Sequence, residues 1–221
     1  MKAEVLEEGG GEVRGGGLSL VWPEVVVSMF GLMVTSSSWD WYQSSLSPFL
    51  ATSYQLNTDT IGLILLSPGL FYIISSTICG LILDRINLGL WAQILGTSLI
   101  CVGYVLFGPI PQINEIKSLL LTLAGLAVQG AGFGFTYIGS LIYMKRSVSQ
   151  RAGGSKRSVV GHVSSLWLIA SNLGSFSGSL AGAAVYDTFG FQYGTFIETL
   201  VLSSSVLILI VFGLFKCKSS I

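Results

Sequence analysis

Residues 90–110 read LWAQILGTSLICVGYVLFGPI, a stretch of membrane-spanning length without a single charged side chain. About 20 consecutive apolar residues suffice for a helix to cross a hydrocarbon core of roughly 30 Å. Further stretches of the same character bring the predicted spans to Val25–Leu50, Ile61–Leu83, Leu90–Ile110, Leu119–Tyr143, Val159–Tyr186 and Phe191–Phe215. Because backbone groups in lipid must form hydrogen bonds within their own segment, the sequence predicts an all-α membrane protein with six transmembrane helices.

The composition argues against a water-soluble domain. Hydrophobic residues make up 51% of the chain and charged residues 10%, with a mean hydropathy of +0.74. Soluble domains usually carry about 25% charged residues. The net charge of zero gives no electrostatic basis for nucleic-acid binding. The basic segment Lys145–Arg157 has no interleaved aromatic residues, and we interpret it as a topology signal that contacts the headgroups of the lipid bilayer.

Positive charge is confined almost entirely to one side of the predicted zigzag. Lys117 stands on one side, against ten basic residues on the other. Those ten are Lys2, Arg14, Arg85, Lys145, Arg146, Arg151, Lys156, Arg157, Lys216 and Lys218. Cytoplasmic loops are enriched in Lys and Arg, so both termini are expected in the cytosol. If one span is removed, the basic residues fall on both sides of the membrane, so the charge asymmetry favours six spans over five or seven.

The chain divides into three regions. Residues 1–22 are rich in Gly and Glu, which predicts a disordered, acidic cytosolic tail or linker. This region lacks the basic start and short apolar core of a cleaved signal peptide. Residues 23–215 form the predicted six-helix bundle, and 216–221 form a cytosolic C-terminal tail. The segment Lys145–Arg157 is expected to be a mobile loop.

The residues that catalysis or metal binding requires are sparse. The chain has one His and three Cys, and it shows no metal-ligand spacing, phosphate loop or nucleophile–base arrangement. We therefore predict no enzyme activity, no cofactor and no metal site.

A polar helix face surrounds one carboxylate in the first span. Asp40 shares this face with Ser36, Gln43, Ser44 and Ser47, because the spacings are those of one side of a helix. Ionisable groups inside a membrane usually face a cavity or a partner. Trp39, Trp41 and Tyr42 flank the acid and could stack on a cationic ligand. The alternative is an interfacial aromatic belt from which Asp40 reaches the headgroups.

Other polar residues within the spans are weaker candidates for a substrate or proton pathway. Gln129 and Asn172 lie in the middle of the fourth and fifth spans, where hydrogen bonding between helices is the alternative role. Glu198 in the last span could pair across helices or be protonated at the lipid edge. His162, beside the basic loop, could titrate near neutral pH or be a hydrated structural residue.

Glycine is concentrated in the spans. Gly174, Gly178 and Gly182 recur every fourth residue, and such a stripe lets another helix backbone approach closely. The run Gly130-x-Gly132-x-Gly134 follows no strand and lacks the spacing of a dinucleotide fingerprint, so close helix packing or local flexibility explains it better.

Several motifs resemble those of the major facilitator superfamily. The segment Gly80–Arg85, which reads GLILDR and includes Asp84, resembles the Gly-x-x-x-Asp-Arg turn between the second and third helices of a superfamily half, without the later Gly and basic residues of that motif. The stripe Gly174–Gly182, followed by Asp187 and Gly190, resembles the eleventh helix. The run from Leu46, with Pro48 and Pro68, resembles helices seven and eight. Across residues 23–215 the chain is most similar to the vesicular amine and polyamine transporter group, solute carrier family 18, B branch.

This resemblance implies the C-terminal six-helix half of a twelve-helix transporter, with residues 1–22 as the central linker. In such transporters the first and fourth helices of each half line the cavity, which favours Asp40 and Gln129 as cavity residues over Glu198. Gly80, Asp84 and Arg85 would belong to a conformational motif. The spans that match helices ten and eleven lack the carboxylates of vesicular monoamine transporters, which argues against monoamine chemistry.

The leading hypothesis is a proton-coupled antiporter of a cationic amine or polyamine in a vesicular, endosomal or plasma membrane. Its partners would be the small-molecule substrate, protons, and a missing N-terminal half or an oligomeric partner. The alternative is a truncated or regulatory half that does not transport and pairs with another carrier chain. A six-helix channel is a third possibility, disfavoured by the Gly80–Arg85 turn.

Overall fold

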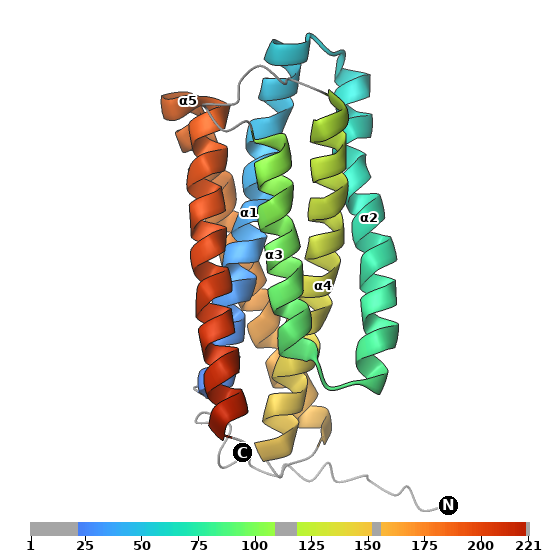
Figure 1. Ribbon diagram of the computed structural model, residues 1–221, viewed down its shortest axis with the longest axis vertical. Coiled ribbons are helices and arrows are strands. Elements are labelled where there is room, and N and C mark those ends of the chain that lie inside the picture. Colours follow the sequence, from blue (N-terminus) through green and yellow to red (C-terminus); the bar gives the residue numbers. More distant parts are fainter. Residues whose placement is uncertain (1–21, 109–118, 152–155, 220–221) are drawn as a thin grey trace, which may run out of the picture.

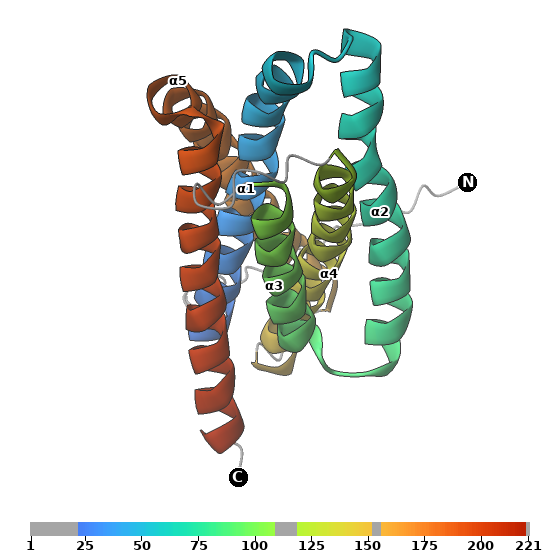
Figure 2. The ribbon, with the colours of Figure 1, turned by 45° about the horizontal axis from the view of Figure 1, so that its top comes forward.

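The computed structural model describes residues 22–108, 119–151 and 156–219, and helices account for nearly all of these residues (Figure 1). The helices are α1 (Pro23–Tyr54), α2 (Thr58–Arg85), α3 (Gly89–Phe107), α4 (Leu119–Arg151) and α5 (Lys156–Ser219). They lie side by side along one long axis, with α2 at one edge and the C-terminal part of α5 at the opposite edge (Figure 1 and Figure 2). The prediction of an all-α protein is confirmed.

The fifth helix contains a sharp reversal at Gly190. The backbone there has φ 77° and ψ 174°, a combination that is essentially restricted to glycine. Two limbs, 156–189 and 191–219, meet at this residue and run in opposite directions (Figure 1). The predicted turn at Asp187–Gly190 is therefore shorter than expected, because the residues that precede Gly190 remain helical.

Four described helices are long and apolar enough to cross a membrane by length and composition. They are α2, α3, residues 119–150 of α4 and residues 161–218 of α5. α1 does not meet this criterion, since polar residues from Ser36 to Ser47 interrupt its apolar character. Large apolar side chains such as Leu63, Leu120 and Phe215 are exposed around the outside of the bundle, which is expected for a surface in contact with lipid.

The basic ends of the helices gather at one end of the bundle. The Lys216 ammonium lies 3.7 Å from a Glu24 carboxylate oxygen and donates to the Tyr143 hydroxyl at 3.2 Å. These contacts bring the end of α5 to the start of α1 and the later turns of α4. Arg146 of α4 meanwhile donates to the Ile86 carbonyl just after α2 at 2.8 Å. Among the described residues, the basic ends of α2, α4 and α5 therefore lie at one end of the fold, while the assignment of this end to the cytosol stays a prediction.

Glycines allow two pairs of helices to approach closely. On α3 and α4, Gly96 faces Gly132, and a Cβ on either would lie 2.5–2.6 Å from the carbonyl oxygen of the other. The stripe on α5 packs against α1: a Cβ on Gly178 would lie 2.6 Å from the Ser37 Cα, and one on Gly182 would lie 3.0 Å from the Trp41 Cα. The predicted role of this stripe in close helix packing is confirmed.

The boundaries at the basic segment and at the C-terminal tail also differ from the sequence prediction. Of the expected loop Lys145–Arg157, residues 145–151 extend α4 and residues 156–157 begin α5, because Lys, Arg and Gln are good helix formers outside the membrane as well. Likewise, residues 216–219 of the expected C-terminal tail continue α5. Residues 1–21 of the predicted tail 1–22, together with Lys117, lie outside the described residues.

A candidate cation-binding site around Asp40

Asp40 lies near the middle of α1 and is half-buried. Within the described residues its carboxylate makes no hydrogen bond and no ion pair. The hydroxyl groups of Tyr42 and Tyr137 lie within electrostatic range of it. A carboxyl group in this position is suited to contact a bound cation.

Four partly buried aromatic rings, one from each of four helices, form a continuous band beside this acid. Trp39 of α1 contacts Tyr72 of α2 with ring centroids 6.0 Å apart, and Tyr72 contacts Tyr137 of α4 at 6.1 Å. Tyr137 in turn contacts Trp167 of α5 at 5.4 Å. We call Trp39, Tyr72, Tyr137 and Trp167 the aromatic band.

Hydrogen bonds fix two members of the aromatic band. The hydroxyl groups of Ser36 and Tyr137 lie 2.9 Å apart, which joins α1 to α4 one helical turn before Asp40. The Trp167 indole donates to the Ser140 hydroxyl at 3.0 Å, which joins α5 to α4. Aromatic faces and a carboxylate together attract organic cations, since the ring faces and the acid both present negative potential.

The structure separates the other residues of the predicted polar face. Ser36 is buried, and Gln43 is exposed. Ser44 points toward Gly182 of α5, and its hydroxyl donates to the Trp41 carbonyl at 2.9 Å. Trp41 is 2% exposed in the core, so it cannot stack on a ligand in this conformation.

The weaker candidates lie in four different environments. Gln129 is fully buried where α4 packs on α3, beside Gly103. Asn172 is exposed and donates to the Leu168 carbonyl of its own helix. His162 is exposed near the start of α5. Glu198, 7% exposed, faces the bundle interior instead of the lipid edge. Their roles in a pathway stay predictions.

The two charged residues of the Gly80–Arg85 motif lie on the surface of this chain, whereas Leu83 is buried. Asp84 and Arg85 are exposed, and a Cβ added to Gly80 would meet no described atom within 4 Å.

Arg146 has a structural role beyond its contribution to the basic topology signal in the sequence. Arg146 donates to the carbonyls of Leu83 and Ile86 and to the Asn87 side chain, so it caps the C-terminal end of α2.

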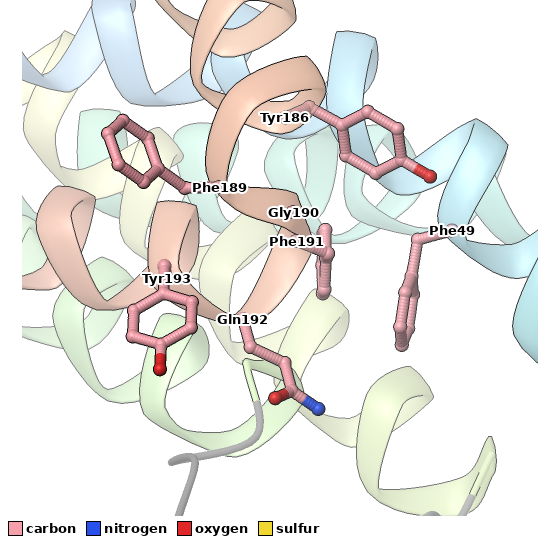
Figure 3. A pocket seen from close by; sticks show the side chains of 7 residues that line it. All are labelled: Phe49, Tyr186, Phe189, Gly190, Phe191, Gln192 and Tyr193. Carbon is pink, nitrogen blue, oxygen red and sulfur yellow. The ribbon is translucent and has the colours of Figure 1, made fainter.

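A separate pocket of about 340 Å³ opens at the bend in α5 (Figure 3). Its lining is Phe49, Tyr186, Phe189, Gly190, Phe191, Gln192 and Tyr193. The Phe49 and Phe191 rings stack on each other with centroids 4.1 Å apart, so the two faces that meet in the stack are not available to a ligand. No charged side chain lines this pocket, so it offers an organic cation less than the Asp40 site.

A family model for the Major Facilitator Superfamily matches residues 28–218. This chain belongs to that superfamily. It is 28% identical over 179 residues to the MFS-type transporter SLC18B1 of Rattus norvegicus and 28% identical to that of Homo sapiens, while the Mus musculus protein is 27% identical. Each alignment covers 80% of this chain and 39% of the relative, so the chain spans well under half the length of these relatives.

Membership explains the lipid-compatible exterior, the helical interior and the glycine-mediated packing together. The superfamily is one of transporters, so the chain is an integral membrane protein of a transporter family, and the resemblance stated from its motifs is confirmed. The sequence did not identify Tyr72, Tyr137 and Trp167. Their spacing along the chain does not indicate a shared site, because only the tertiary fold brings Tyr72 and Trp167 into contact with Tyr137, whose hydroxyl lies within electrostatic range of Asp40.

Proposed function

We propose that this chain forms a cavity-lining six-pass half of a twelve-helix, proton-coupled transporter of small organic cations, with a cationic amine or polyamine as substrate. The observation that carries the proposal is the half-buried Asp40 carboxylate, without an ion-pair partner among the described residues, beside the aromatic band.

Coupling follows from competition for one carboxylate. Asp40 can hold a proton or face a cationic substrate, and either one neutralises its charge. Binding of the substrate cation therefore favours release of the proton, and protonation favours release of the substrate. Rocking of this bundle against a second one would expose Asp40 to the two sides of the membrane in turn.

The exposed side of α1 supports a partner bundle. Gln43 is exposed less than one turn from Asp40, and a polar group of this kind is costly against lipid. The chain covers only 39% of its relatives, which fits a missing N-terminal half or an equivalent second chain. The basic end of the bundle favours cytosolic termini, in a vesicular, endosomal or plasma membrane.

Proteoliposomes that contain the complete carrier test the proposal. Spermidine, a monoamine and tetraethylammonium serve as radiolabelled probes, driven by an imposed proton gradient. We expect Asp40→Asn to abolish gradient-driven uptake, and the exposed control Asp59→Asn to preserve it. Wild-type uptake by Asp40→Asn carriers would refute the role of Asp40.

The short match to the relatives also favours a second candidate, a regulatory half that binds another carrier chain without transporting. Affinity purification of the tagged chain from its native membrane distinguishes the two. Recovery of a species near twice its mass, or of a paired second bundle with uptake activity, supports the transporter. A stable complex with a complete carrier whose uptake is unchanged by Asp40→Asn supports the regulatory half.

A further inference from the structure

A second carboxyl group lies inside the bundle, away from the aromatic band. Glu198, on the 191–219 limb of α5, is 7% exposed, and its Oε1 atom has no hydrogen-bond partner among the described residues. Within the described chain no Lys, Arg or His pairs with it. A buried, unpaired carboxyl group is costly in a membrane, so its retention requires an explanation.

The Gln129 amide on α4 presents the same problem. The side chain is fully buried, and neither Oε1 nor Nε2 has a hydrogen-bond partner in the part of the chain that the structure describes. Each unsatisfied buried donor or acceptor is unfavourable, because it has lost its hydrogen bonds to water and gained none in the protein. Helix packing places this residue against Gly103 of α3, which leaves it no route to the exterior.

Tyr104 of α3 connects the two groups. Its ring is fully buried, and its hydroxyl donates to the Ser38 carbonyl of α1 at 2.5 Å. The same hydroxyl lies within interaction range of the Gln129 side chain and of the Glu198 carboxyl. Tyr42 on α1 is the other titratable group that faces Tyr104.

The polar atoms around Tyr104 match the requirements of a buried water. Such a molecule usually makes about three hydrogen bonds to polar groups that otherwise lack partners. Gln129 supplies a free amide donor and a free acceptor, and Glu198 supplies a free carboxyl oxygen. These unsatisfied groups come from separate helices, so helix packing brings them together around the Tyr104 hydroxyl.

We propose that Glu198, Gln129 and Tyr104 form an internal, water-holding proton site that is distinct from Asp40. The proton resides on the Glu198 carboxyl group, and a buried water connects that group to the Gln129 amide beside the Tyr104 hydroxyl. Binding adds one proton to the carboxylate and breaks no covalent bond. The site exists in this chain whether or not Asp40 takes part in transport.

Infrared spectroscopy of the purified full chain in lipid nanodiscs tests the site directly. We expect a carbonyl stretch of a protonated carboxylic acid at neutral pH that disappears in Glu198→Gln. The matched control Asp40→Asn should retain that band. Absence of the band from the folded wild type, or its persistence in Glu198→Gln, would overturn the proposal.

Two further variants keep the Glu198 carboxyl group in place, so the proposed site can still be tested if Glu198→Gln misfolds. Gln129→Leu and Tyr104→Phe should shift the carboxylic band, because each removes a polar neighbour. Exchange into H₂¹⁸O should shift an O–H stretch of bound water in the wild type and not in Gln129→Leu. The local control is Thr199→Ala, because the Thr199 hydroxyl donates to the Thr195 carbonyl of its own helix; this variant should leave the band unmoved. An unmoved band in both test variants would show that these residues do not share a site.

Discussion

The Ser36 hydroxyl of α1 lies 2.9 Å from the Tyr137 hydroxyl of α4. This contact bridges residues 101 positions apart in sequence and fixes the aromatic band beside Asp40. It also explains why Ser36 belongs to the site although it is buried. The serine positions a ring and has no open surface for a ligand.

Tyr137 offers a test that separates its hydroxyl from its ring. Tyr137→Phe keeps the aromatic face and removes the contact with Ser36, so we expect a loss of about 1 kcal/mol in stability and a small change in cation affinity. Tyr137→Leu should weaken binding of tetraethylammonium to the complete carrier much further. Scintillation proximity binding measures both variants, and equal affinities would argue against a role for the ring.

Gly178 should tolerate no side chain. Gly178→Ala places a methyl group against the Ser37 backbone, and the overpacking is expected to cost about 1–3 kcal/mol. The control is Gly161→Ala, where a Cβ meets nothing within 4 Å and the gain in helix propensity is up to about 1 kcal/mol. Thermal unfolding in detergent compares them, and equal melting temperatures would refute the tight α1–α5 contact.

Arg146 is expected to stabilise the end of α2. Arg146→Ala removes its hydrogen bonds to Leu83, Ile86 and Asn87, with an expected cost of at least about 1 kcal/mol. Arg146→Lys keeps the charge and loses the planar fork, so it should recover only part of that stability. Hydrogen exchange of the amides of residues 83–88 should accelerate in both variants and stay unchanged in Lys145→Ala.

Cys217 provides a native probe of membrane orientation. It is exposed near the end of α5, whereas Cys79 is buried and Cys101 is half-buried. If the basic end is cytosolic, a membrane-impermeant maleimide should label Cys217 only after the cytosolic face becomes accessible. Ser53→Cys, introduced at the exposed far end of α1 in a Cys217→Ser background, should label from the opposite face. The reverse pattern would invert the topology.

Lys216, near the end of α5, contacts the start of α1 and the later turns of α4, and these contacts should contribute to stability. The ammonium group lies near Glu24, donates to Tyr143 and stands 4.9 Å from that ring centroid. Lys216→Ala should lower stability by about 1 kcal/mol, since the lysine is 42% exposed and solvent screens the pair. Lys218→Ala is the matched exposed control, and the difference between the two variants should shrink in high salt.

The sequence predicted most features that depend on local chemistry. Apolar length predicted the helices, and the spacing of Gly174, Gly178 and Gly182 predicted a close helix contact that the fold confirms. The boundaries at Arg151 and Gly190 were predicted less well, because helix propensity continues past the apolar residues until a residue such as Gly190 breaks it.

The sequence by itself therefore determined the membrane class, the helical elements, the superfamily and the acid at position 40. Only the tertiary structure showed that Tyr72 and Trp167 contact Tyr137, whose hydroxyl lies within electrostatic range of Asp40, and that Glu198 and Gln129 are buried inside the bundle. The physical reason is the distance along the chain over which each kind of signal acts. Hydropathy and helix period act between near neighbours in the chain, whereas a binding site depends on side chains that meet only after the helices pack.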